Sequence, residues 1–166
     1  MSLILLHKSL YNMIDREILE KKKRLQKVRN TLKEISGIEV LCIYENQYIS
    51  KFCGMWERLS ELGYCSPDKI PDDKIDCKSE DSVIYQWVLD RTNLEDGMTV
   101  YLMCRDVWVK VMISDIHKAV KDLWNVIGKQ NGLTIVNEDL TVLKEFGSDS
   151  RDEYNYLYDE YNLTVR

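Results

Sequence analysis

Two neighbouring β-rich runs limit the folds open to this chain more than any other feature. Residues 98–104 and 107–113 are rich in Val, Tyr, Trp, Met and Ile, and only Arg105 and Asp106 separate them. Two such runs joined by two residues are typical of a β-hairpin, although this pair lacks the glycine that the tightest turns prefer. The sequence therefore predicts an antiparallel hairpin here.

Further periodic segments surround the hairpin. Alternating or β-branched runs predict strands over 38–44, 133–136 and 140–146, and apolar residues at helical spacing predict helices over 47–62, 79–91 and 114–127. The last two helices have candidate capping residues at Ser79 and at Ser114 or Asp115. Hairpins predominate over βα alternation, so we expect an α+β fold: a mixed, mostly antiparallel sheet of about five strands with helices packed on it.

A long amphipathic helix is predicted before the first strand, over about 9–36. Ser9 is placed to cap its start and Gly37 its end. The interval from Arg16 to Lys33 holds eight basic and two acidic residues, a local charge of +6. Its apolar stripe consists of Ile14, Ile18, Leu25, Val28, Leu32 and Ile35.

The best internal boundary is the segment 64–79. It contains both prolines, Pro67 and Pro71, and four aspartates, and we expect one irregular acidic loop. Its spacing lacks the features of an EF-hand, so no calcium site is expected. Neither side of the loop builds a separate core, so we expect one domain over 1–166, with its α+β core at 38–147 and an acidic, tyrosine-rich tail at 148–166.

Composition narrows the class of protein. The chain has 166 residues and a net charge of −5, which argues against nucleic-acid binding over the whole surface. The longest apolar run near the start, 3–6, is too short for a signal peptide or a membrane span, and the five cysteines form no C-x-x-C pair. We therefore expect a cytoplasmic protein with reduced thiols, no metal and no cofactor. Cys42, Cys53 and Cys104 are expected in the core, and Cys65 and Cys77 are expected to be exposed.

Catalytic signatures are absent from the sequence. It has two histidines, His7 and His117, and no hydrolase elbow, P-loop, metalloprotease or dinucleotide motif. We expect a protein that is not an enzyme. An enzyme whose site is assembled from distant carboxylates, a cysteine and His117 stays an alternative.

The C-terminal tail is the leading candidate for a binding surface. From Glu138 onward there are eight acidic and three basic residues, and clustered carboxylates with tyrosines suit the capture of a basic protein. The tyrosine spacing also predicts a terminal helix that rests on the sheet. The candidate partner-binding residues are Asp149, Asp152, Glu153, Tyr154, Tyr156, Tyr158, Asp159, Glu160 and Tyr161.

The basic N-terminal helix offers a second binding hypothesis. Lys22, Lys23, Lys27 and Arg29 are candidates for contact with nucleic-acid phosphates. A solvated helix face balanced by acidic residues elsewhere explains the same charges, and a short coiled-coil seam is a third interpretation. We therefore do not expect nucleic acid to be the main partner.

One segment resembles a known family. The stretch WVKVMISDIHKAVKDLWNVIGKQNGLTIVNEDL, residues 108–140, is similar to the small cytosolic immunity proteins of bacterial contact-dependent and polymorphic toxin systems. The resemblance lies in the step Asp122-Leu123-Trp124 and in the hairpin Ile135-Val136-Asn137-Glu138-Asp139-Leu140. It implies a non-enzymatic inhibitor that masks a basic toxin with an acidic surface, and it assigns no individual functional residue.

Overall fold

The computed structural model describes residues 3–45, 49–62, 70–149 and 157–164, and the side chains within them outside 3–14 and 148–161. The helices are α1 (Leu3–Lys33), α2 (Cys53–Glu61), α3 (Asp81–Thr92), α4 (Ile116–Leu123) and α5 (Lys129–Asn131), with a 3-10 turn at Ser50–Phe52 and a π-helical turn at Trp124–Gly128. The strands are β1 (Ile38–Ile43), β2 (Asp73–Asp76), β3 (Thr99–Cys104), β4 (Val107–Ile113), β5 (Leu133–Asn137), β6 (Val142–Asp149) and β7 (Leu157–Thr164).

In the described part of the chain, seven strands form one sheet in the order β1-β4-β3-β5-β6-β7-β2. Every pairing in it is antiparallel. The α+β class and the five predicted strands are confirmed, whereas the expected mixture of parallel and antiparallel pairs is wrong. Strands β4 and β5 do run parallel to each other, but β3 lies between them, so the helical connection crosses over a strand.

Two strands were not predicted. Strand β2 lies inside the segment expected to be an irregular loop, and β7 replaces the expected terminal helix. The helix prediction for this segment is wrong. It rested on tyrosines three and four residues apart, but a segment rich in Tyr and Leu can also form a strand. The backbone of β7 pairs with β6 on one side and β2 on the other, and these hydrogen bonds decide its conformation.

The β3–β4 turn contains no glycine, and its two residues adopt a strained backbone conformation instead. Arg105 has φ 50° and Asp106 has φ 61°, so both residues adopt the left-handed conformation of a two-residue hairpin turn. The Arg105 side chain donates from Nε to the Thr31 hydroxyl at 3.3 Å. The predicted hairpin is confirmed, and its turn is tied to α1.

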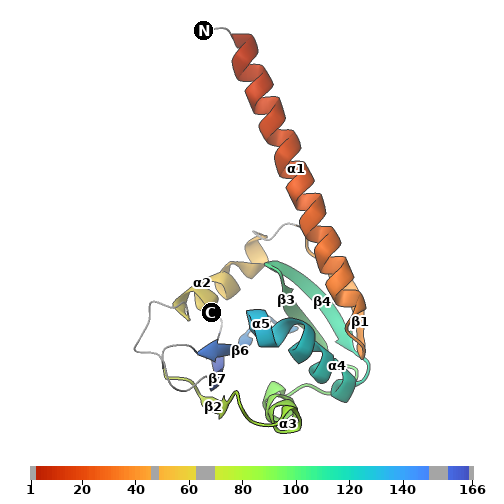
Figure 1. Cartoon of the computed structure of the whole chain (residues 1–166), viewed down its shortest axis with the longest axis vertical. Coiled ribbons are helices and arrows are strands. Elements are labelled where there is room, and N and C mark those ends of the chain that lie inside the picture. The colour runs from red at the N-terminus through yellow and green to blue at the C-terminus, as the bar shows by residue number, and fades with distance from the viewer. Residues whose placement is uncertain (1–2, 46–48, 63–69, 150–156, 165–166) are drawn as a thin grey trace.

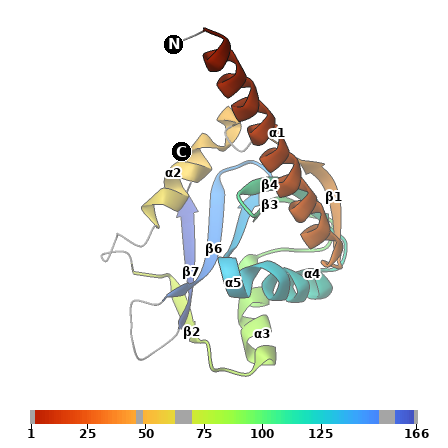
Figure 2. The ribbon, with the colours of Figure 1, turned by 45° about the horizontal axis from the view of Figure 1, so that its top comes forward.

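One face of the sheet carries the larger core, covered by α1, α3 and α4 (Figure 2). Alternate residues of the central strands, among them Val100, Leu102, Val109 and Val111, are nearly or fully buried there. Each covering helix contributes its apolar stripe to this core, and those contributions are Leu25, Val28, Leu32 and Ile35 from α1, Ile84, Trp87 and Val88 from α3, and Ala119, Val120 and Leu123 from α4.

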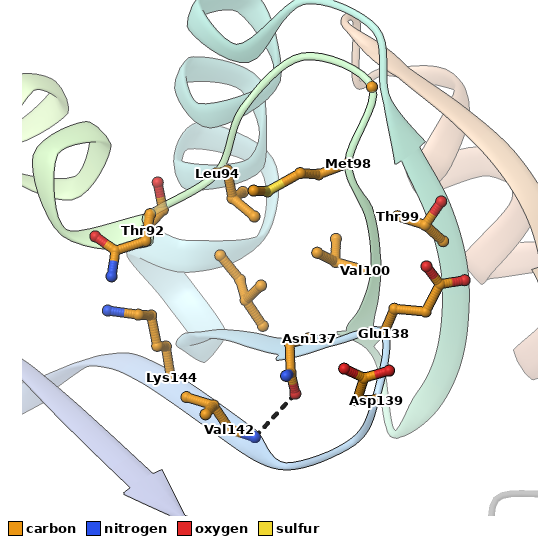
Figure 3. A pocket seen from close by; sticks show the side chains of 13 residues that line it. Thr92, Leu94, Met98, Thr99, Val100, Asn137, Glu138, Asp139, Val142 and Lys144 are labelled. Atoms are coloured by element: carbon orange, nitrogen blue, oxygen red, sulfur yellow. Dashed lines mark hydrogen bonds between the residues drawn. The ribbon is translucent and has the colours of Figure 1, made fainter.

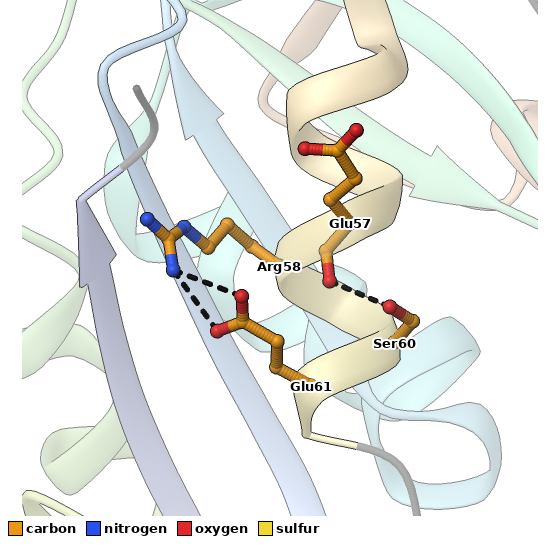
Figure 4. A network of polar contacts seen from close by, with 4 residues as sticks. All are labelled: Glu57, Arg58, Ser60 and Glu61. Atoms are coloured by element: carbon orange, nitrogen blue, oxygen red, sulfur yellow. Dashed lines mark hydrogen bonds and ion pairs between the residues drawn. The ribbon is translucent and has the colours of Figure 1, made fainter.

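The opposite face carries a smaller aromatic core beneath α2. Phe52 stacks on Trp108 with ring centroids 5.1 Å apart, and the Phe52 ring also meets the edge of Tyr101 at 5.5 Å. Beside α2, Arg58 Nη1 donates to both carboxylate oxygens of Glu61 at 3.0 Å (Figure 4). The sheet is therefore covered on both faces.

Helix α1 is longer than predicted and projects from the body (Figure 1). It begins by Leu3, so Ser9 lies within the helix and does not cap it. Its described contribution to the core starts at Leu25, whereas Ile18 and Leu19 are 48% and 51% exposed. At the other end, the carbonyl of Gly37 accepts hydrogen bonds from the backbone amides of Ser114 and Asp115.

Of the two other predicted helix caps, one is confirmed. The Asp115 carboxylate accepts from the Lys118 amide at 3.1 Å and caps α4, which confirms one of the two candidates. Helix α3 begins after Glu80, one residue later than a cap at Ser79 would require. No helix in the described residues is both long enough and apolar enough to cross a membrane.

Candidate functional site

The fold brings two acidic segments together at one end of the sheet. Strand β2 comes from the segment 64–79 and β7 from the tail, and they pair with Asp73 opposite Glu160 and Lys74 opposite Asp159. Strand β2 is the last strand of the sheet, so its outer edge has no strand partner among the described residues. We call these two strands the acidic edge.

Two carboxylates in and beside β2 make hydrogen bonds and an ion pair that fix the acidic edge to the rest of the fold. The Asp73 carboxylate accepts from Trp87 Nε1 at 2.9 Å and pairs with Arg91. The hydrogen bond from Trp87 is the main cause that lowers the pKa of Asp73, and the nearby Arg91 charge adds to it. Beside β2, Asp72 accepts from the backbone amide of Asn162 at 2.6 Å.

Exposure of the acidic edge alternates along β2. Lys74 and Asp76 point to solvent, and Ile75 is half-buried against the larger core. Ile70, just before β2, is 88% exposed. A cationic partner would therefore meet carboxylates next to one apolar side chain.

Some of the candidate partner-binding residues of the tail lie in described strands, and the others lie outside the described residues. Asp149 belongs to β6, and Tyr158, Asp159, Glu160 and Tyr161 belong to β7. Alternate positions of a strand belong to opposite faces, so the four residues of β7 do not share one surface. Asp152, Glu153, Tyr154 and Tyr156 lie outside the described residues.

The basic helix residues are all exposed on α1. Arg29 Nη2 lies 3.8 Å from a carboxylate oxygen of Glu45, and Lys21 Nζ lies 3.4 Å from the other. Lys23 pairs with Glu20 one turn away at 3.2 Å. Because exposed pairs of this kind are weak, the helix keeps a basic surface that another ligand can reach.

Charge is separated along the chain. Residues 1–36 hold nine of the 23 basic and four of the 28 acidic residues, a net charge of +5. Residues 37–166 therefore carry a net charge of −10. The molecule consists of an acidic body and a basic projecting helix, which a net charge of −5 conceals.

A cavity of about 440 Å³ opens on the sheet face that carries the larger core, between the loop after α3 and the β5–β6 turn (Figure 3). Its apolar lining includes Leu94, Met98, Val100 and Ile135. Sequence reasoning missed this cavity because its lining comes from three separate segments.

Among the described carboxylates, the one whose pKa is shifted furthest lies outside this cavity. Burial raises the pKa of Glu145 to about 7, and the hydrogen bond from the Thr134 hydroxyl opposes that change. Glu145 pairs in register with Thr134 on the α2 face, whereas its neighbour Lys144 lines the cavity on the other face. The cavity and the perturbed acid therefore do not form one site.

The remaining candidates for chemistry are scattered. His117 is exposed on α4, and the side chain of His7 lies outside the described part. Cys104 is buried as predicted, but the predicted burial of Cys42 and Cys53 is wrong because both are exposed, and Cys77, in the turn after β2, is half-buried. Within the described ranges, no three His, Cys, Asp or Glu side chains converge on a point that could hold a metal ion.

Comparison of this chain with known proteins identifies no similar protein or family. No protein-family model matches the sequence, and no curated protein or solved structure shows significant similarity to it. Function must therefore be argued from the residues and their arrangement.

Proposed function

We propose that this chain is a protein-binding module that neutralises a basic partner, such as a toxin domain, by covering it with the acidic edge. The observation that carries the proposal is the pairing of β2 with β7, which joins two acidic segments at an edge of the sheet that has no further strand among the described residues. Clustered carboxylates speed the encounter with a cationic surface and select against acidic partners.

Two further observations support this proposal. Residues 37–166 carry the net charge of −10, so the field of the whole body attracts a basic protein. An edge strand also exposes backbone groups that an extended segment of a partner can pair with. The proposal places the protein in the cytosol, in keeping with the free thiols of Cys42, Cys53, Cys77 and Cys104.

The test is affinity capture from a lysate of the native organism at low salt, after nuclease treatment. The bait is compared with a variant of the acidic edge, Asp76→Lys/Asp159→Lys/Glu160→Lys. A control variant, Glu39→Lys/Glu57→Lys/Glu95→Lys, changes the net charge equally at exposed positions away from the edge.

We expect wild type and control to retain one basic protein in stoichiometric amount, and salt to elute it because exposed charges are screened. The edge variant should lose it. Equal retention by the edge variant would remove the acidic edge as the interface.

Nucleic-acid binding by α1 is the second candidate function. The observation that favours it is the exposure of Lys22, Lys23, Lys27 and Arg29 on a helix that projects from the body. Phosphate contacts of this kind lose affinity steeply as salt rises from about 50 to about 200 mM.

Fluorescence anisotropy with labelled duplex and single-stranded oligonucleotides tests this candidate. Alanine at the four basic positions should abolish binding, and alanine at four exposed lysines of the body, Lys74, Lys78, Lys118 and Lys121, should not. An absence of binding at low salt would exclude it.

A further inference from the structure

The N-terminal half of α1 projects beyond the sheet and the other helices (Figure 1). Residues 15–20 are all exposed, and Leu25 is the first described side chain of α1 that is buried. Residues 3–14 begin the same helix, and eight of these twelve residues are apolar. A helix in water owes most of its stability to packing of its apolar face and little to local propensity. The projecting half therefore needs a partner.

A seven-residue repeat runs along α1. The first position of the repeat is held by Ile4, Tyr11, Ile18, Leu25 and Leu32, and the position three residues later by His7, Ile14, Lys21, Val28 and Ile35. We call these two positions the seam of α1. Its residues from Leu25 onward are buried in the larger core, whereas Ile18 is 48% exposed. The seam thus continues from an interface within the chain to a part of the helix that a second helix can reach.

Leu19 lies beside the seam and not on it. Its side chain is 51% exposed, but the residues seven positions before and after it, Asn12 and Gln26, are polar. Ile18 and Leu19 therefore have nearly equal exposure and differ in whether their position continues the repeat. A helix that packs along the seam distinguishes the two residues, whereas general apolar attraction does not.

The charges of α1 indicate what kind of helix fits. Residues 3–20 contain two basic and three acidic residues, and residues 21–33 contain seven basic and no acidic residues. A helix that lies on an anionic membrane has a basic polar face, so the nearly neutral first half does not suit one. Lys8 and Asp15 are seven residues apart and both directly follow a seam position. Opposite charges at one position of the repeat suit a second copy of the same segment.

The basic residues also set the orientation of the two copies. A parallel pair would place Lys21 against its own counterpart on the seam and align the two basic segments 21–33, and such like-charge contacts are costly. An antiparallel pair over residues 4–21 separates these segments to opposite ends. It also brings Lys8 of each helix beside Asp15 of the other, which gives two ion pairs.

We propose that the projecting half of α1 binds the same segment of a second copy of this chain as an antiparallel two-helix coiled coil. An overlap over residues 4–21 is about 27 Å long, at about 1.5 Å per residue. The contact leaves the acidic edge of both copies free. It is independent of the proposed function, because it needs no other protein and no residue of β2 or β7.

Sedimentation equilibrium of the full chain over a wide range of concentrations tests the proposal. We expect the mass to rise from that of one chain to that of two. Ile18→Asp should raise the dissociation constant of the dimer about a hundredfold or more, because each dimer loses two buried apolar contacts. Leu19→Asp is the matched control, with the same charge change at the same exposure, and it should have a much smaller effect.

A second pair of variants tests the orientation. Asp15→Lys should raise the dissociation constant about three- to tenfold, because two exposed ion pairs become repulsive, and Lys8→Asp/Asp15→Lys should restore it. Glu17→Lys changes the charge equally at a position that faces no charged residue in the antiparallel pair, so it should have little effect. Residues 15–19 are exposed, so circular dichroism melts of the monomer should show an unchanged Tm in these variants.

Three results would overturn the proposal. The first is a monomer at every concentration. The second is an equal effect of Ile18→Asp and Leu19→Asp, since it would show that the apolar surface has no seam. The third is weakening by Glu17→Lys without weakening by Asp15→Lys, since a parallel pair brings residue 17 beside Lys22 of the other copy.

Discussion

Among the described carboxylates, Glu145 is the one whose pKa changes most on folding. Its carboxyl group has an ordinary pKa of 4.5 and a raised pKa of about 7 in the folded chain, because burial penalises the charged form. The folded state therefore binds more protons than the unfolded state between these two values. Stability from this group is fully present below about 4.5 and is lost as pH rises through about 7.

Glu145→Gln should remove this part of the pH dependence. The amide keeps a hydrogen bond to Thr134 and cannot ionise, so the variant should gain stability relative to wild type as pH rises from 5 to 8. Urea unfolding at several pH values measures the difference in free energy. A difference that does not change with pH would contradict the buried position of the carboxyl group.

Gly37 is required for two separate reasons. Its φ of +73° favours glycine, and a Cβ there would lie 2.3 Å from the Asp115 carbonyl oxygen and 2.6 Å from the Ala119 amide nitrogen. Both neighbours are backbone atoms at the start of α4, so neither can move cheaply. The α1–β1 connection and α4 consequently pack as one unit.

Gly37→Ala should cost about 3 kcal/mol or more of unfolding free energy, because strain and a steric clash add. Gly97→Ala is the matched control, since Gly97 has φ +86° with no atom within 4 Å of its Cβ position. It should cost only about 1 kcal/mol, the penalty of the left-handed conformation. Equal losses in denaturant melts would refute the close approach at Gly37.

Strand β7 shows how an element acquires a role that its composition does not reveal. Its acidic and tyrosine residues fit a solvated tail, yet its backbone pairs with β6 from Asp149 to Val142 and with β2 from Asp76 to Asp73. Strand β2 has no other strand partner among the described residues. The position of β2, and hence the acidic edge, depends on β7.

Truncation after Asp149 should therefore destabilise the whole domain. It removes the partner of β6 and the support of β2, and we expect unfolding to lose more than about 3 kcal/mol, or about 6–12 °C in Tm. Circular dichroism melts compare it with the full-length Asp159→Lys/Glu160→Lys variant, which should keep its Tm within a few degrees. An unchanged Tm after truncation would show that β7 contributes no pairing energy.

The whole molecule is electrically divided between α1 and the body. A net charge of −5 predicts binding to an anion exchanger alone, whereas a basic helix that projects from an acidic body predicts binding to exchangers of both signs. This division matters for either proposed function, because the helix and the acidic edge attract partners of opposite charge.

Retention on a cation exchanger at pH 7 and low salt tests this division. Wild type should bind, alanine at Lys22, Lys23, Lys27 and Arg29 should flow through, and alanine at Lys74, Lys78, Lys118 and Lys121 should bind like wild type. Exposed charges are screened over about 10 Å at 0.1 M salt, so retention should fall sharply with salt. Flow-through of the wild type would mean that the body masks the helix.

The local sequence pattern determined several elements of the fold. The hairpin around Arg105 and Asp106, the stripe from Leu25 to Ile35 and the cap at Asp115 all follow from residue type and spacing. Each depends on interactions within a few residues or on one repeating face, which a linear sequence records directly.

Long-range pairing decided the rest. The place of β7 between β6 and β2, the cavity between Leu94, Ile135 and Lys144, and the separation of Lys144 from Glu145 onto opposite faces depend on strand order and register. Strand order joins residues about ninety positions apart, as Asp72 and Asn162 show, and no periodicity encodes such a contact. Both candidate sites lie at such joins, so the tertiary arrangement was needed to find them.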